Sequence, residues 1–387
     1  CMHRTLIAQT NEVDDAQLAV DDLLAQLALE RNLSSNCVGF IFGDTSVFDP
    51  ELLPALSARV NFDIIGFNSN VSSGPSHKFE FNYLTLMVIT GDDLKISTVL
   101  SDDFANTHHE AIIDLYRKAA SKLDNPPKLV YLLGSRQSSY FHPDRVMASL
   151  NSVVGDCPVF GALGCDLDSI LKNGYLIYNG KKYLNRAALV LFDGPIRPKF
   201  SLFKIPENKF LKSKAIITSC KDNVIEEING LPAIDYLGTL GLVIEKEMDF
   251  SFSVPLIMEH PDAGFWEPIL ILKQKNGGHV ICTKDVRINS TLGLAGFDEF
   301  DVMKTANDLA EELRWETFNC CLIHSCQGRY ISLGLDYMAE INRFRNILSQ
   351  MTPYSISYTG GEICPRIGDE KGPVNGFHTL SLTCCRF

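Results

Sequence analysis

The hydrophobic pattern of the chain repeats one unit, which runs from about residue 38 to 67 and again from about 130 to 164. Each copy begins with a short apolar run ending in glycine, at Gly43 or Gly134, and then enters a polar loop. The loop leads through Phe-x-Pro into a helix-like segment, and a second apolar run closes the copy. Short apolar runs bounded by turn residues are typical of buried strands, and proline suits the first turn of a helix. The pattern therefore predicts a strand–loop–helix–strand unit of the size of a βαβ crossover.

A third apolar run begins a comparable unit near residue 320, and this unit closes near residue 363. Its helix is predicted from apolar residues on one stripe, which are Leu335, Met338, Ile341, Phe344 and Leu348. We therefore predict an α/β protein with mixed β-sheets covered by helices and with repeated strand–loop–helix–strand units.

The passage IEEINGLPAIDYLGTLG marks a change in this pattern. It predicts a strand up to Ile228, an Asn-Gly turn, and a helix opened by Pro232. Because 387 residues are long for one domain, we place a domain boundary here. The N-terminal domain, residues 1–228, would hold two of the units, and the C-terminal domain, residues 229–387, would hold the third. A hairpin with its turn at residues 276–278 is predicted beyond the boundary.

Composition excludes several classes of protein. The formal charge of −12 and the pI near 5.2 argue against binding to nucleic acid or to anionic membranes. No apolar stretch approaches the length of a transmembrane helix, and no basic-then-apolar leader opens the sequence. The 12 cysteines include no CxxC pair and no zinc-ribbon spacing. We therefore expect a cytoplasmic protein with reduced thiols.

Two short passages in the third unit carry unusual chemistry. SCQGR places a thiol and a guanidinium in a loop after a predicted strand, and GGEI sets paired glycines before a carboxylate. Arginine offers a planar fork to a carboxylate or phosphate, and amides near a helix start add donors. The expected ligand site is Ser325, Cys326, Arg329, Gly360, Gly361 and Glu362. Alternatively, Arg329 is a surface ion-pair partner, or Glu362 pairs with it.

A third passage, NGFHTLSL, brings a histidine into the argument. Side chains alternate along a strand, so His378, Leu380 and Leu382 would share one face. His378 is then either a core histidine bonded to a backbone carbonyl or a ligand-binding residue. His324, at the end of the preceding strand, is the second candidate.

Together these passages resemble the FIST family, a sensory domain of bacterial signalling proteins and of some eukaryotic F-box proteins. The resemblance rests on the order of EINGLPAIDYLG, SCQGR with Glu340 downstream, and GGEI, while IIGFNSN and VFGALGC suit the family's N-terminal half. It covers nearly the whole chain, with an N-terminal part from about Cys37 to Lys221. The ending NGFHTLSLTCC departs from the family, which more usually has Asn shortly before Thr, and this leaves the role of His378 open.

The resemblance implies an intracellular sensory protein for a small ligand, with amino acids proposed as ligands for the family. An amino acid would place its carboxylate on Arg329 and its ammonium on Glu362. Stand-alone members of this length also resemble nitric-oxide-sensing haem proteins, which signal to a separate histidine kinase or to a diguanylate cyclase or phosphodiesterase. Haem would need a neutral imidazole in an apolar pocket, from His378 or else His324. The absence of CxxCH excludes covalent haem attachment.

Two other classes stay open beside the sensory one. A cysteine-dependent hydrolase would use Cys326 as nucleophile, with a histidine base and Glu362 as the orienting carboxylate. A ligand-free scaffold or adaptor would leave all these loops empty. We expect no enzyme, because nothing in the sequence marks a positioned base beside Cys326.

Overall fold

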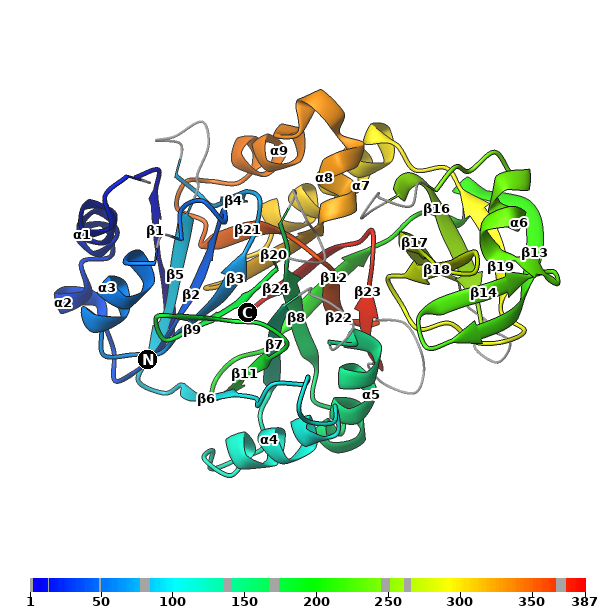
Figure 1. Cartoon of the computed structure of the whole chain (residues 1–387). Helices are drawn as coiled ribbons and strands as arrows, with labels where there is room; N and C mark the ends of the chain where they lie inside the picture. Colours follow the sequence, from blue (N-terminus) through cyan, green and yellow to red (C-terminus); the bar gives the residue numbers. More distant parts are fainter. Residues whose placement is uncertain are drawn as a thin grey trace.

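The structure is a computed structural model, and it describes most of the chain. The described residues are 3–12, 14–48, 50–76, 84–135, 141–166, 174–244, 251–260, 266–366 and 374–387. Their strands form four sheets, three of which share the body of the molecule while the fourth stands at one side (Figure 1). Mixed sheets are covered by helices, which confirms the predicted α/β fold class.

All three predicted strand–loop–helix–strand units are present, and in each the two strands are parallel. The units are β2 (Asn36–Gly43), α3 (Leu52–Ala58) and β3 (Ile64–Asn68); β7 (Leu129–Ser135), α5 (Pro143–Val154) and β8 (Val159–Gly164); and β20 (Cys321–Cys326), α8 (Gln327–Ser332), α9 (Ala339–Ile347) and β21 (Tyr354–Thr359). The internal repeat is therefore confirmed, and the third copy has the topology of the first two.

Each unit also has the same neighbours in its sheet. An antiparallel strand pairs with the first strand of the unit, and an edge strand lies beyond it. The antiparallel strands are β5 (Leu84–Gly91), β11 (Ala187–Asp193) and β24 (Leu382–Arg386), and the edge strands are β1 (Arg4–Thr10), β6 (Lys95–Leu100) and β12 (Lys199–Phe203). The same strand order therefore occurs in three sheets: the edge strand, the antiparallel strand, and then the first and second strands of the unit.

The three sheets exchange strands in a ring. The strand that follows the second strand of each unit pairs with the second strand of another unit. These strands are β4 (Ser72–Ser73) on β21, β9 (Leu176–Tyr178) on β3, and β22 (Glu362–Arg366) on β8, with β10 (Lys181–Tyr183) and β23 (Val374–His378) added at two edges. The rings of His3 and Phe387 lie 5.4 Å apart, so the two ends of the chain meet as well. The body of the molecule therefore has a pseudo-threefold arrangement.

Two glycines occupy the same place in the first two units. A Cβ atom on Gly66 would overlap the carbonyl oxygen of Ile41, and one on Gly161 would overlap that of Leu132. In both units the partner residue lies directly opposite on the parallel first strand. Close approach of the two backbones explains why each second apolar run contains glycine at this point.

The inner faces of the three sheets pack on one shared core, to which the first strands contribute Phe40, Tyr131 and Leu322. The outer faces carry helices and have separate cores of their own. The covering helices are α1 (Ala16–Leu27), the short α2 (Leu29–Asn32) and α3 on the first sheet; α4 (Ala111–Ala120) and α5 on the second; and α7 (Glu299–Arg314), α8 and α9 on the third (Figure 1).

The fourth sheet is a closed antiparallel barrel. Its strands run in the order β13-β19-β16-β17-β18-β14, and pairing of β13 with β14 closes the ring. The elements are β13 (Phe210–Lys221), β14 (Val224–Ile228), β15 (Leu231–Pro232), α6 (Ala233–Thr239), β16 (Ser251–Glu259), β17 (Trp266–Lys275), β18 (His279–Cys282) and β19 (Thr291–Ala295). Apolar side chains fill its interior, and Leu237 of α6 joins them.

The barrel is an insertion between β12 and α7. Its two connections to the body lie side by side, since the Gly296 N–H donates to the Lys209 carbonyl at 3.0 Å. Lys209 ends a 3₁₀ turn (Glu207–Lys209) that leads into β13, and a second 3₁₀ turn (Gly334–Asp336) joins α8 to α9. The hairpin predicted around residues 276–278 is confirmed as β17 and β18, with Gly277 and Gly278 at positive φ.

The predicted boundary at residue 228 falls inside the barrel. β13 and β14 precede it, and β15 to β19 follow it. The expected Asn-Gly turn is present, with Asn229 and Gly230 both at positive φ, and α6 starts after Pro232 as predicted. The division into residues 1–228 and 229–387 stays a prediction.

Two details of the third unit differ from the prediction. The passage NGFHTLSL is not one strand, because β23 ends at His378 and β24 begins only at Leu382. Leu380 lies in the turn between them with a φ of 51°. The predicted apolar stripe is also wrong at Leu335, which is fully exposed in the 3₁₀ turn. Both errors arose because strict periodicity was extended through a turn.

Candidate functional site

The six residues predicted to bind a ligand lie near the carboxyl ends of β20 and β21. They are Ser325 and Cys326 at the end of β20, Arg329 in α8, Gly360 and Gly361 after β21, and Glu362 at the start of β22. The side chains of Ser325, Arg329 and Glu362 have no exposed surface. Whether these residues bind a ligand stays a prediction.

Arg329 is paired with Glu340 and not with Glu362. Its Nη2 lies 2.6 Å from the Glu340 carboxylate and also donates to the carbonyl of Val302 at 3.1 Å. Ser325 completes the cluster, since its hydroxyl donates to the second Glu340 oxygen at 2.7 Å. The cluster ties α7, α8 and α9 to the end of β20. The interpretation of Arg329 as a surface ion-pair partner is wrong, because the pair is entirely buried.

Glu362 forms a separate cluster with two hydroxyl groups. Thr359 donates to one carboxyl oxygen at 2.5 Å and Ser381 to the other at 2.6 Å. Burial raises the pKa of Glu362 to about 8, although both hydroxyls act in the opposite direction. The group is therefore mostly protonated at neutral pH. A protonated carboxyl group is a poor partner for the ammonium of an amino acid.

The paired glycines join two units of the fold. Gly360 donates its N–H to the carbonyl of Leu163 at 2.8 Å, and the Leu163 N–H donates to the Gly361 carbonyl at 3.1 Å. Gly361 has a φ of 142°, and a Cβ atom there would overlap the ring of Phe377. The glycines of GGEI thus allow β22 to leave the third sheet and pair with β8.

Cys326 lacks the surroundings of an activated nucleophile. Burial raises the pKa of its thiol well above the usual value, and the nearby Glu362 adds to the effect. Cysteine nucleophiles react as thiolates, which a neighbouring base or cation must stabilise. The environment of Cys326 therefore does not favour the hydrolase hypothesis.

Neither candidate histidine is placed to bind haem iron. Nε2 of His378 donates to the carbonyl of Cys364 at 2.9 Å, and burial with nearby Lys204 and Lys284 holds its pKa well below the usual value. His324 uses both ring nitrogens, with Tyr131 at 2.7 Å and Ser357 at 3.0 Å. Among the described residues, no group of three or more His, Cys, Asp or Glu could hold a metal ion. The residues around these histidines do not fit haem, whose binding stays a prediction.

A cavity lies elsewhere, between the barrel and the body of the molecule. It has a volume of about 520 Å³, and we call it the cleft. The residues that line it come from α5, from the barrel and from the β22–β23 hairpin. They include Asp144, Arg145, Asp222, His260, Glu267, Lys284, Asp285, Arg366, Asn375 and Phe377. None of the six predicted residues is among them.

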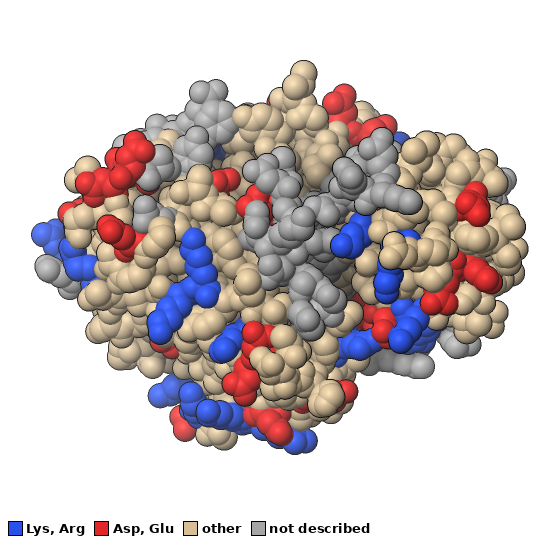
Figure 2. Space-filling view, in the orientation of Figure 1, with Lys and Arg blue, Asp and Glu red and all other residues tan. Residues whose placement is uncertain are grey.

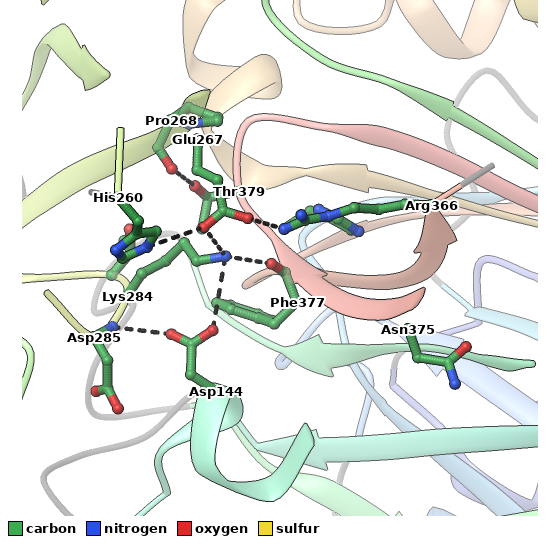
Figure 3. A network of polar contacts seen from close by, with 12 residues as sticks. Asp144, His260, Glu267, Pro268, Lys284, Asp285, Arg366, Asn375, Phe377 and Thr379 are labelled. Carbon is green, nitrogen blue, oxygen red and sulfur yellow. Dashed lines mark hydrogen bonds and ion pairs between the residues drawn. The ribbon is translucent and has the colours of Figure 1, made fainter. Parts of the chain in front are cut away.

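Glu267 and Lys284 form the centre of the cleft (Figure 3). Both belong to the barrel, both are about 5% exposed, and Lys284 Nζ lies 3.0 Å from a Glu267 oxygen. The second Glu267 oxygen pairs with Arg366 of β22, and His260 lies 3.8 Å from the first. Lys284 also donates to the carbonyl of Phe377 at 2.5 Å. Two buried charges of the barrel are therefore satisfied partly by the body.

Further contacts cross the cleft toward its outer end. Asp144 at the start of α5 lies 3.7 Å from Lys284 and accepts the N–H of Asp285 at 2.9 Å. Arg145 pairs with Asp222 and lies 3.7 Å from Asp285. Basic and acidic side chains also lie next to each other on the surface where the barrel, at the right, meets the body (Figure 2). Around this cavity, charged groups of the barrel and of the body therefore contact each other directly.

The pKa values of the cleft residues reflect this crowding of charge. Burial alone would raise the pKa of Glu267, but Lys284, His260 and Arg366 outweigh it and hold that pKa well below its usual value. Burial lowers the pKa of nearby Lys204 to about 8, and Arg366 adds to this effect. At the outer end, burial raises the pKa of Asp285, reinforced by Asp144. Cationic side chains therefore outnumber the single carboxylate of Glu267 at the inner end, whereas at the outer end the carboxylates of Asp222 and Asp285 surround Arg145.

A second cavity, of about 450 Å³, opens near the amino ends of β2 and β3. Its lining includes Asn36, Asp63 and Asn179 but no lysine or arginine. It lies beside the first unit, with Ile96 of β6 and Asn179 also in its lining, and its lining includes no residue of the barrel. The cleft has the stronger features of a binding site, because it combines an interdomain position with convergent buried charges.

The sequence analysis missed the cleft for a simple reason. Asp144 and Lys284 are 140 positions apart, and nothing in PDR or CTKDV marks either residue as special. The sequence does place both residues beside predicted elements, but this position does not distinguish a binding residue from any other. Asp144 follows the proline that opens a helix, and Lys284 follows a predicted hairpin strand. Only the insertion of the barrel beside α5 brings them together.

Comparison with known protein families agrees with this architecture. The profile of the FIST N domain matches residues 37–231, and that of the FIST C domain matches residues 236–365. The chain belongs to the FIST family. FIST domains are sensory domains for small ligands in signalling proteins, and they are sensory rather than catalytic. A search of curated proteins finds no match.

The FIST matches divide the chain within the barrel, between β15 and α6. Both FIST domains therefore contribute strands to the barrel, and both contribute residues to the cleft. Asp144 lies in the FIST N part, and Glu267 and Lys284 lie in the FIST C part. Within the described residues, the helices are all too short or too polar to cross a membrane.

Proposed function

We propose that this FIST protein is a cytoplasmic sensor that binds an amino-acid-like molecule in the cleft. The observation that carries the proposal is the cavity of about 520 Å³ between barrel and body, lined by buried charges of both signs. Ligand sites for small molecules are usually concave, interdomain and of about 300–1,000 Å³. A small zwitterion fits this volume and matches the separation of charge within the cleft.

The orientation of the ligand follows from the electrostatics. The carboxylate would lie at the inner end, where Lys284 and Arg366 donate and Lys204 adds positive charge. The ammonium would lie near Asp144 and Asp285, whose carboxylates are 26% and 32% exposed. Hydrogen bonds between charged partners are the strong ones in such a site. The same acidic groups would repel a ligand that carries only negative charge.

Binding would change how the barrel sits on the body. The ion pairs Arg366–Glu267 and Lys284–Asp144 both join the barrel to the body. A bound zwitterion competes for these groups and replaces direct contacts with contacts through the ligand. Any difference in affinity between two barrel positions then shifts their populations. We propose that a separate signalling protein, such as a histidine kinase or a cyclic-di-nucleotide enzyme, reads this shift.

Calorimetry with the twenty common amino acids tests the proposal. Asp144→Asn should weaken the binding of any amino acid found by about tenfold or more, because a hydrogen bond to a charged group contributes about 1.5–3 kcal/mol. Asp114→Asn is the matched control, since Asp114 is 85% exposed on α4 and does not line the cleft. Failure of every amino acid to bind the wild-type protein would overturn the assignment.

Two further measurements separate the other predicted sites from the cleft. Glu362→Gln should change amino-acid affinity much less than Asp144→Asn does, because Glu362 does not line the cleft. A loss of binding in Glu362→Gln with none in Asp144→Asn would move the site to the predicted cluster at Arg329 and Glu362. After incubation with haem and removal of unbound haem, the absorption spectrum of the protein should show no Soret band. A Soret band that disappears in His378→Ala would support the haem hypothesis instead.

A further inference from the structure

One turn connects the cleft to the buried carboxyl group of Glu362. It consists of residues 379–381, between β23 and β24. On the barrel side, the Thr379 hydroxyl donates to the carbonyl of Pro268 at 2.7 Å, and Figure 3 shows this bond beside Glu267. On the other side, the Ser381 hydroxyl donates to Glu362 at 2.6 Å. Three consecutive residues therefore contact both the barrel and the third unit.

The same turn also holds the end of β20. The N–H of Cys326 donates to the carbonyl of Ser381 at 2.9 Å. Cys326 is the last residue of β20 and directly precedes α8. Displacement of Ser381 would therefore release an amide at the end of a strand and a carboxyl group at the start of β22. The turn controls two of the contacts that define the predicted site.

Leu380, in the middle of the turn, has a strained backbone. Its φ is 51°, a region that bulky side chains rarely adopt. The other non-glycine residues with positive φ in the described chain are Ala28, one aspartate and four asparagines. Leu380 is 2% exposed and packs with Ile257 and Leu270 of the barrel. Packing against the barrel thus holds Leu380 in an unfavourable conformation, as is common in switch regions.

Strand β23 connects the cleft to the turn. Phe377 is the next-to-last residue of this strand, and its carbonyl accepts a hydrogen bond from the ammonium of Lys284 at 2.5 Å. Only His378 separates Phe377 from Thr379. A ligand carboxylate that draws Lys284 away from this carbonyl removes one of the contacts that fix β23 to the barrel.

We propose that the 379–381 turn is a two-state element that reports occupancy of the cleft to Glu362 and Cys326. The inference rests on the proposed function, because the cleft ligand is the signal. In the empty state, the barrel holds Leu380 strained and Ser381 bonded to Glu362. In the occupied state, Lys284 turns to the ligand, Leu380 relaxes, and Ser381 releases both partners. The strain at Leu380 favours the relaxed conformation of the turn, so the loss of a few contacts in the cleft is enough to shift the turn to its second state.

Hydrogen exchange of the full chain tests the coupling without any ligand. Lys284→Met removes the ammonium from the Phe377 carbonyl and mimics its withdrawal. We expect exchange at the Cys326 amide to rise about tenfold, while the end of β2 around Gly43 stays unchanged. The end of β2 is the matched internal control, because it is the corresponding strand end in the first unit. An unchanged Cys326 amide, or an equal rise at Gly43, would overturn the proposal.

A second experiment isolates the strain. Leu380→Gly and Leu380→Ala both remove the side chain, but only glycine adopts positive φ without cost. In the wild-type background the equilibrium constant for unfolding should be about tenfold smaller for Leu380→Gly than for Leu380→Ala. In the Lys284→Met background this difference should largely vanish, because the turn has already relaxed. A difference that persists unchanged would show that cleft and turn are uncoupled. Such a result would leave the proposed ligand site, tested by calorimetry, untouched.

Discussion

The hydroxyl of Tyr131 lies 2.7 Å from Nε2 of His324 in the centre of the molecule. Both side chains are fully buried, and their rings are nearly parallel with centroids 5.9 Å apart. Nδ1 of His324 lies 3.0 Å from the Ser357 hydroxyl, so a polar chain runs through the shared aromatic core. Tyr131 belongs to the second unit, and His324 and Ser357 belong to the third. These hydrogen bonds therefore fix how the second and third units face each other.

Tyr131→Phe should destabilise the protein by about 1–3 kcal/mol. The ring still fills its place, but Nε2 of the fully buried His324 loses its hydrogen-bond partner, and an unsatisfied buried polar group costs this amount. Urea unfolding monitored by circular dichroism measures the change. Tyr183→Phe is the control, because Tyr183 is only half-buried, and it should change stability by less than about 0.5 kcal/mol. Equal effects of the two substitutions would contradict a structural role for the Tyr131–His324 bond.

His324 should also make stability depend on pH. Burial lowers its pKa to about 3, whereas the ordinary value is 6.5. Between these values the unfolded chain binds a proton that the folded chain does not, so stability falls as the pH is lowered below about 6.5. The slope attributable to one such group is about 1.4 kcal/mol per pH unit. Unfolding free energies at about pH 7, 6 and 5 should therefore fall less steeply in His324→Gln, and parallel curves would refute the assignment.

Glu362 should make the stability of the protein depend on pH in the direction opposite to His324. Burial raises its pKa to about 8 from the ordinary 4.5, so the folded chain keeps a proton that the unfolded chain has released. The resulting stability is fully present below about pH 4.5 and is lost as the pH rises through 8. Glu362→Gln keeps the shape and has no proton to lose. Compared at about pH 5 and pH 8.5, the wild-type protein should lose at least about 1.4 kcal/mol more than this variant.

These groups show which parts of the molecule its sequence predicts. The units at Val38, Val130 and Cys320 were predictable, because each begins with an apolar run that leads into a glycine-bearing loop, and the first two also share Phe-x-Pro. Asn229-Gly230 and Asn276-Gly277 likewise marked turns that the structure contains. Such signals are local, since they depend on backbone conformations that only a few residues accept. The ring of exchanged strands depends instead on pairing between residues far apart in the sequence, and no comparable sequence pattern marks it.

The candidate site shows the same division. Ser325, Arg329 and Glu362 were recognised as unusual residues near strand ends, which is where the structure places them. Their partners were not predictable, because Glu340 on α9 takes Arg329 and Ser381 takes Glu362. Strand alternation failed at Leu380, where packing against the barrel overrides the preference of leucine for negative φ. Long-range packing thus determined the pairings that local chemistry left open.

Gly161→Ala should be among the most destabilising single substitutions in the second unit. The added methyl group would overlap the Leu132 carbonyl on the neighbouring parallel strand, and neither backbone can move without breaking the β7–β8 ladder. Overpacking of this kind costs about 1–3 kcal/mol or more. Gly238→Ala is the matched control, because Gly238 lies in α6 with open space around its Cβ position. That variant should be stabilised by up to about 1 kcal/mol, since alanine favours helices over glycine. Chemical denaturation of both variants measures the contrast, and a Gly161→Ala variant as stable as the wild-type protein would contradict the close approach of β7 and β8 at this point.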